Sequence, residues 1–277
     1  FWQTRASFPF AANHQALSIE AGMFIFVALV GFSYFRRKQL LTVFIMVAVI
    51  VIIAANSRTP ILGILLGGVI IFCWRLGGKR LVFPVFIIVL LIPLIFSFID
   101  IQSLLSQINL DLVAFTRKKD ITELATLNNR VLIWSTILNK YGGFEAIHLV
   151  GYGAFGHISS GISYIYAQYW RDPELITLHN AYLQHLIDDG YIGFFVFIAL
   201  LWNAIRVSLN QLSNGNLAFL YPFAVLIYLV VCSTLDVTIY FNQNVSFLFF
   251  LLANFQVAFG EKKLLEKHNG ELLPEPI

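Results

Sequence analysis

The sequence predicts an all-α protein, a polytopic membrane helix bundle with one large, partly helical loop that faces water. Of its 277 residues, 58% are hydrophobic and 12% are charged, about half the charged share of roughly 25% in a soluble domain. Apolar runs recur along the chain, most of them long enough to cross about 30 Å of hydrocarbon. One stretch, residues 100–181, interrupts them with charges, glycines and tyrosines. The formal net charge of +3 is too small to indicate a nucleic-acid partner.

The apolar runs predict seven membrane spans, at residues 16–35, 40–55, 60–74, 81–99, 191–206, 218–235 and 245–260. These spans must be helical, because backbone amides find no water in the bilayer core and the alternation of a barrel strand is lacking. The chain then divides into four spans in residues 1–99, the loop at 100–181, three spans in 182–260 and a polar tail at 261–277, which we expect to be disordered. Because the chain begins with Phe1, we expect further spans to precede it in a longer protein.

Basic residues between the spans fall on alternate connections, and therefore on one side of the membrane. They are Arg36, Arg37, Lys38, Arg75, Lys79, Arg80, Arg206, Lys262, Lys263 and Lys267. The positive-inside rule makes that side cytoplasmic, together with the C-terminal tail. The opposite, outer side then receives residues 56–60, the large loop and residues 236–244.

The loop itself has internal order. Asp120 and Glu123 indicate the capped start of a helix, and apolar residues then recur at three- and four-residue steps as far as Tyr141. Two glycines at 142 and 143 end this helix. Its apolar stripe either lies on the membrane surface or packs on the ends of the spans. Gly151 and Gly153 predict a tight turn further along.

Arg58 is the strongest single candidate for chemistry, because it lies in a short polar break between the second and third spans. An arginine costs about 2.5–3.5 kcal/mol at the centre of a bilayer and less near its surface. Its side chain either snorkels to the outer surface or holds an anion there. Arginine suits phosphate, since its planar donors bind two oxygens at once.

Arg130 and His179 are weaker signals when each is taken alone. Arg130 stands beside the apolar stripe and could be a solvated helix residue, and His179 could orient the return of the chain into the fifth span. His185 makes no zinc pair with His179, because residues six apart lie on different helical faces and no third ligand is evident. The cysteines lie within apolar spans, which favours buried thiols over a disulfide or a metal site. The acidic pair at 188–189 indicates the start of the fifth span.

Four short motifs follow one another between residues 57 and 193. They are Ser57-Arg58-Thr59 opening a span, Asn129-Arg130 with Trp134 four residues later, the turn Gly151-x-Gly153, and His179-Asn180-x-Tyr182-Leu183 followed by Asp189-Gly190-x-x-Gly193. This series resembles the bacterial O-antigen ligase and O-antigen polymerase superfamily, of which the chain would be the C-terminal part. The resemblance places the protein in the bacterial inner membrane, with its active site on the periplasmic side and its C-terminus in the cytoplasm.

The resemblance implies an enzyme, a metal-independent, inverting glycosyltransferase without a cofactor. The donor would be a polysaccharide on undecaprenyl pyrophosphate, and the acceptor a hydroxyl group, with ligation to lipid A–core as the first expectation. Arg58 and Arg130 would bind the pyrophosphate and stabilise the charge that develops on it. His179 would be the general base, a common role for histidine near neutral pH. The expected substrate-binding residues are Ser57, Asn180, Tyr182, Gly151 and Gly153, with Asn180 and Tyr182 supporting His179.

Alternative functions remain open from the sequence. A polymerase that lengthens a lipid-linked glycan, or a protein O-oligosaccharyltransferase, would use the same donor-binding residues and a different acceptor. A transporter would place ionisable residues deep in several spans, whereas here the polar residues gather on one side. Glycan transfer makes one geometric demand: Arg58, Arg130 and His179 must converge at the outer surface of the membrane.

Overall fold

The computed structural model describes residues 14–34, 38–55, 57–77, 80–81, 84, 87, 130–164, 177–216 and 219–238. All regular structure in these ranges is helical and none of it is strand, which agrees with the predicted all-α class. The predicted span at 245–260, nearly all of the span at 81–99, the helix start at Asp120 and the tail at 261–277 lie outside the described residues.

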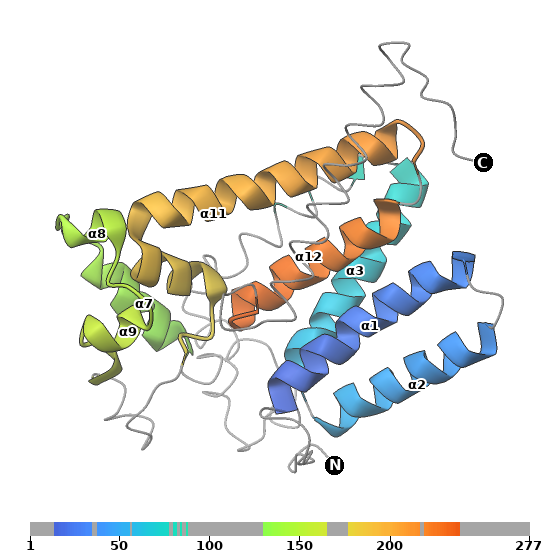
Figure 1. The fold of residues 1–277 in the computed structure, drawn as a ribbon, viewed down its shortest axis with the longest axis horizontal. Helices are drawn as coiled ribbons and strands as arrows, with labels where there is room; N and C mark the ends of the chain where they lie inside the picture. The colour runs from blue at the N-terminus through green and yellow to red at the C-terminus, as the bar shows by residue number, and fades with distance from the viewer. Residues whose placement is uncertain are drawn as a thin grey trace, which may run out of the picture.

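Long helices run side by side in the described part of the chain, and each overlaps one predicted span (Figure 1). They are α1 (His14–Tyr34), α2 (Lys38–Ala54), α3 (Arg58–Gly77), α11 (Ala181–Ser213) and α12 (Leu220–Leu235). Helix α2 packs on α1, whereas α12 packs on α1, α3 and α11. The start of α3 and the end of α12 lie at the same end of the bundle, where the Cys232 thiol is 4.0 Å from the carbonyl oxygen of Thr59.

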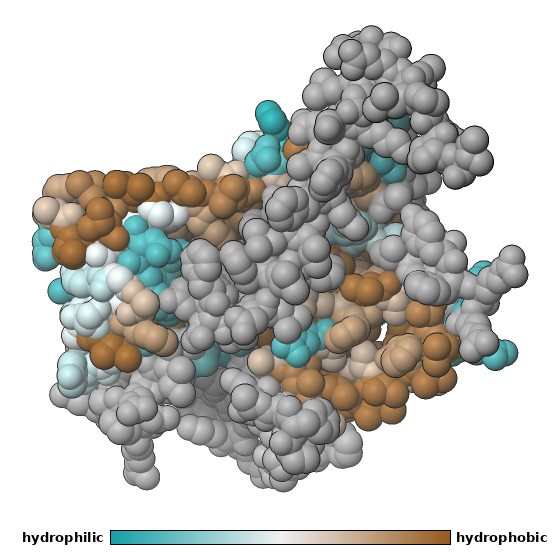
Figure 2. Space-filling view, viewed as in Figure 1, coloured by the Kyte–Doolittle hydropathy of each residue, from teal (hydrophilic) through white to brown (hydrophobic). Residues whose placement is uncertain are grey.

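Membrane insertion has its clearest support in α11. Within the described ranges, this helix is the one that is long and apolar enough to cross a membrane, and shorter apolar stretches occur in α1, α2, α3 and α12. Phe195, Val196 and Leu200 of α11 are exposed, and an apolar band runs along the upper edge of the molecule in Figure 2, where α11 lies. The total of seven spans remains a prediction.

Helix α12 forms the core of the bundle, since residues 223–234 are all buried. Tyr228 fixes its position. The Tyr228 hydroxyl donates to the carbonyl oxygen of Ile19 in α1 at 2.7 Å, and a Cβ added at Gly22 or Gly63 would lie 2.2 Å or 2.7 Å from the Tyr228 side chain. Only glycine allows α1 and α3 to approach this ring so closely. The ring therefore holds the bundle against α12.

The predicted loop helix is present as α7 (Arg130–Lys140), and it ends at Gly142 and Gly143 as expected. Its buried residues are Ile133, Trp134 and Ile137, with Tyr141 just beyond its end. They pack against Leu178, which precedes α11, and against Leu186 and Ile187 in the first turns of that helix. The sequence left open whether the apolar stripe lies on the membrane surface or packs on the ends of the spans. The described part of the stripe packs on protein.

Tyr141 also makes a polar contact in this core. Its hydroxyl donates to the carbonyl oxygen of Leu186 at 2.7 Å. Burial raises the pKa of Tyr141 well above the ordinary value for tyrosine, so the hydroxyl keeps the proton that it donates.

Helix α11 departs from the prediction at its start. The acidic pair Asp188 and Asp189 lies inside the helix, which begins eight residues earlier than Asp189, at Ala181, behind the cap residue Asn180. The pair ends the first of two helical segments in α11, and the second segment, which contains the predicted fifth span at 191–206, begins directly after it, as expected. The backbone breaks one residue later, at Gly190 (φ 66°, ψ −169°), and Figure 1 shows α11 folding back at this point. The sequence therefore predicted the start of the second segment and missed the first segment, which Asn180 caps.

Candidate functional site

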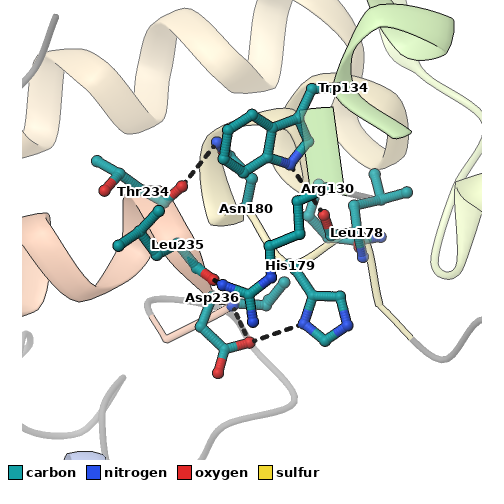
Figure 3. A network of polar contacts seen from close by, with 10 residues as sticks. Arg130, Trp134, Leu178, His179, Asn180, Thr234, Leu235 and Asp236 are labelled. Atoms are coloured by element: carbon teal, nitrogen blue, oxygen red, sulfur yellow. Dashed lines mark hydrogen bonds and ion pairs between the residues drawn. The ribbon is translucent and has the colours of Figure 1, made fainter. Parts of the chain in front are cut away.

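Backbone carbonyl groups at the end of α12 bind side chains from other parts of the chain and so bring the site residues together. The last four carbonyls of a helix have no partner within it. Here the carbonyl oxygen of Thr234 accepts from Asn180 Nδ2 at 3.1 Å, and that of Leu235 accepts a short hydrogen bond from Arg130 Nη1. Figure 3 shows Arg130, Asn180 and His179 meeting around this helix end. Residues more than 100 positions apart in the sequence are thereby joined.

His179 lies beside the acid that follows α12. The distance from His179 Nδ1 to Asp236 Oδ1 is 3.5 Å, and the two side chains are 22% and 15% exposed. Solvent can therefore reach both groups, although most of each is covered. His179 also has φ 52°, in the left-handed region, which costs about 1–3 kcal/mol for a residue other than glycine. Such a backbone persists only where its surroundings enforce it.

The residues on either side of His179 are held by side chains. Trp134 Nε1 donates to the carbonyl oxygen of Leu178 at 3.2 Å. Asn180 caps α11, accepting from the backbone N–H of Leu183 at 3.0 Å while it donates to α12. Asn180 thus joins the chain directly after His179 to both α11 and α12, and its expected role in supporting His179 stays a prediction.

The Ser57-Arg58-Thr59 motif reaches the same end of the bundle. Arg58 is the first residue of α3, and its neighbours Ser57 and Thr59 are buried. The carbonyl oxygen of Thr59 faces the thiol of Cys232, one turn before the end of α12. The main-chain position of Arg58 is therefore near the helix end that binds Arg130 and Asn180.

Gly151, Gly153 and Tyr182 have structural contacts. The two glycines have φ of 80° and 81°, and the N–H of Gly153 donates to the carbonyl oxygen of Asp188 at 2.9 Å. They dock the turn between α8 (Ile147–Val150) and α9 (Gly156–Ser159) onto the kink of α11.

Tyr182 likewise ties two helices together. Its hydroxyl donates to the carbonyl oxygen of Val230 in α12 at 3.2 Å. The contacts of Gly151, Gly153 and Tyr182 show that these residues hold elements of the fold together. Their expected role in substrate binding stays a prediction.

Among the described side chains, the site contains the Arg130 cation, the His179 imidazole and the Asp236 carboxylate, and the start of α3 lies nearby. Among the described residues, no group of three or more His, Cys, Asp and Glu side chains is placed to hold a metal ion. An arginine at this position can bind oxyanions, and a histidine beside a carboxylate can accept a proton.

Sequence reasoning missed Asp236 and the carbonyl oxygens of Thr234 and Leu235. Asp236 had a usable signal, because it is an acid directly after an apolar span on the predicted outer side. The carbonyl groups had none, since every residue carries one.

The profile of the O-antigen ligase family matches residues 41–198, more than half of the chain. The chain belongs to the O-antigen ligase family. The matched region contains Arg58, Arg130 and His179, and it ends before Asp236. Members of this family are generally integral to bacterial membranes and act in O-antigen and lipopolysaccharide synthesis. No curated relative and no solved structure matches the chain.

Proposed function

We propose that this member of the O-antigen ligase family transfers a glycan from undecaprenyl pyrophosphate to an acceptor hydroxyl group at the periplasmic face of the inner membrane. The observation that carries the proposal is the meeting of Arg130 and His179, from separate motifs, at the end of α12 (Figure 3). The start of α3, with Arg58, lies at the same end. Binding a pyrophosphate beside a base is the minimum that such a transfer needs.

In the proposed reaction, Arg58 and Arg130 bind the pyrophosphate. His179 takes the proton from the acceptor hydroxyl while its oxygen bonds to the anomeric carbon. The bond from that carbon to the pyrophosphate oxygen breaks, and the configuration inverts. The arginines stabilise the negative charge that the leaving pyrophosphate gains. No metal ion takes part in the step.

Asp236 has a defined place in this scheme. Its carboxylate is 3.5 Å from His179 Nδ1, which suits a proton on Nδ1 and leaves Nε2 to act as the base. Once His179 is protonated, the carboxylate stabilises the imidazolium, as the acid does in other histidine-based sites. Asp236 therefore orients the base and supports its charge.

The acceptor is tested with the full-length protein in membranes and a labelled undecaprenyl-pyrophosphate glycan, with and without lipid A–core. Label that moves onto lipid A–core would support ligation, the outcome that we expect. A ladder of longer lipid-linked glycans without that acceptor would instead support a polymerase. No transfer of glycan to lipid A–core, to a lipid-linked glycan or to a protein would contradict the proposal and favour transport.

Single substitutions test the roles of the two arginines. Arg58→Ala and Arg130→Ala should each abolish transfer, because the pyrophosphate would lose a cation that stabilises it, while the protein remains in the membrane. Arg206→Ala, at an exposed position on α11, is a matched control that should transfer normally. Transfer at the normal rate by either test variant would contradict pyrophosphate binding at that residue.

A further inference from the structure

The backbone just before His179 is held at both of its polar groups. The carbonyl oxygen of Leu178 accepts from Trp134 Nε1, and its N–H donates to Gln184 Oε1, each at 3.2 Å. Leu178 is fully buried. The two side chains come from α7 and α11, which are separate elements. Leu178 therefore cannot rotate without breaking a buried hydrogen bond.

Gln184 is itself fixed by a buried network. Its Nε2 lies 3.0 Å from both carboxylate oxygens of Asp188 and 3.1 Å from His157 Nδ1. Asp188 Oδ1 also accepts from the N–H of Gly156 at 2.7 Å. Gln184, His157 and Asp188 are all at most 3% exposed.

This network allows one orientation of the Gln184 amide. Turning the amide over would set its NH₂ group against the N–H of Leu178 and its oxygen against the Asp188 carboxylate. The carboxylate thus selects the orientation in which Gln184 accepts from Leu178. A glutamine anchored at one end to a buried acid is a stiff support for the backbone at its other end.

We propose that Gln184 is a positioning residue that, together with Trp134, holds His179 in its left-handed backbone conformation. The conformation, with φ 52°, is unfavourable in isolation and must be imposed by neighbours. Asn180 fixes the chain after His179. The chain before it is fixed by the two hydrogen bonds of the Leu178 backbone to Trp134 and Gln184, which we call the Leu178 clamp. Without the clamp, the His179 backbone can change conformation, and the imidazole then turns away from Asp236. This inference rests on the proposed function, because it assigns His179 the role of base.

The test compares Gln184→Met with Gln211→Met in the full chain. Methionine keeps the length of the side chain and removes the amide. Gln211 is a matched control, since it is also buried in α11 and lies in the last turn of that helix, away from the Leu178 clamp. We expect Gln184→Met to lower kcat for transfer by roughly 10- to 100-fold, with the KM for the donor unchanged. Gln211→Met should keep both values.

Trp134→Phe is the second variant, because it frees the Leu178 carbonyl and leaves the contacts of Asp188 in place. It should also lower kcat without changing the donor KM. If both side chains act through the same backbone, the double variant should lose little more than the worse single variant. If the fold-losses in kcat of the two single variants instead multiply in the double variant, the two side chains do not act through the same backbone, and the inference of a shared clamp is overturned.

Hydrogen exchange of the peptide that contains Leu178 tests the clamp without any transfer assay. Exchange at this peptide should be faster in Gln184→Met than in the wild type and in Gln211→Met. Unchanged exchange, or a normal kcat in a folded Gln184→Met protein, would overturn the inference. Lack of transfer by the wild type would count against the proposed function, whereas the exchange result would still decide whether Gln184 holds Leu178.

Discussion

Asn180→Ala removes two hydrogen bonds from a residue that is 3% exposed. The first is the cap of α11, where the side chain accepts from the N–H of Leu183 at 3.0 Å, and its loss costs about 0.5–2 kcal/mol. The second joins Nδ2 to the carbonyl oxygen of Thr234 at 3.1 Å. Leaving that buried carbonyl unpaired costs about 1–3 kcal/mol. We expect the free energy of unfolding to fall by about 1.5–5 kcal/mol, the sum of the two contributions.

The assay is denaturant unfolding of the purified protein in a fixed detergent, followed by helical circular dichroism. Asn180→Ser separates the two contributions, because serine is a good cap residue but is too short to reach Thr234. It should lose about 1–3 kcal/mol. Asn203→Ala, at an exposed position on the same helix, is the control and should stay within about 0.5 kcal/mol of the wild type.

Two results would refute this account of Asn180. Wild-type stability of Asn180→Ala would mean that neither hydrogen bond contributes. A serine variant as unstable as the alanine variant would mean that the cap contributes nothing. Asn180→Ala should also lower the rate of glycan transfer, because the chain directly after His179 loses its attachment to α12.

Further predictions concern catalysis, packing and metal dependence. Asp236→Asn should lower kcat for transfer by roughly 10²- to 10⁴-fold at normal protein levels, and an unchanged pH–rate profile and kcat would exclude a role beside His179. Gly151→Ala should lower the midpoint of thermal unfolding more than Gly153→Ala, because only at Gly151 would a Cβ meet backbone, 2.2 Å from the carbonyl oxygen of Asp188; equal shifts would contradict this. EDTA should leave transfer unchanged, and loss of activity that a divalent ion restores would disprove the metal-free mechanism.

The helices of the described part were predictable because their signals are local. Apolar runs marked α1, α2, α3 and α12, and glycines marked the end of α7. The start of α11 was not predicted correctly. Asn180 carries a weak capping signal, and its position became clear only from its hydrogen bonds to Leu183 and Thr234.

The candidate site was predictable in part. Arg130 and His179 were identified by residue type and order, and the structure brings both to the end of α12. Asp236 was missed, because one acid beside a span has many possible roles until a partner is known. Gln184 was missed for a different reason, since a glutamine inside an apolar helix gives no sign of whether its partner is water, carboxylate or backbone.

The sequence by itself determined the helical class, the residues that can bind an anion or accept a proton, and the resemblance to the O-antigen ligase family. These properties depend on side-chain chemistry and on patterns within a few turns of chain. Only the tertiary structure decided that the end of α12 gathers the site, because Thr234 and Leu235 act through backbone oxygens that carry no mark of residue type. It also decided the strained backbone of His179, since a left-handed histidine is stable only where distant elements hold the chain on both sides.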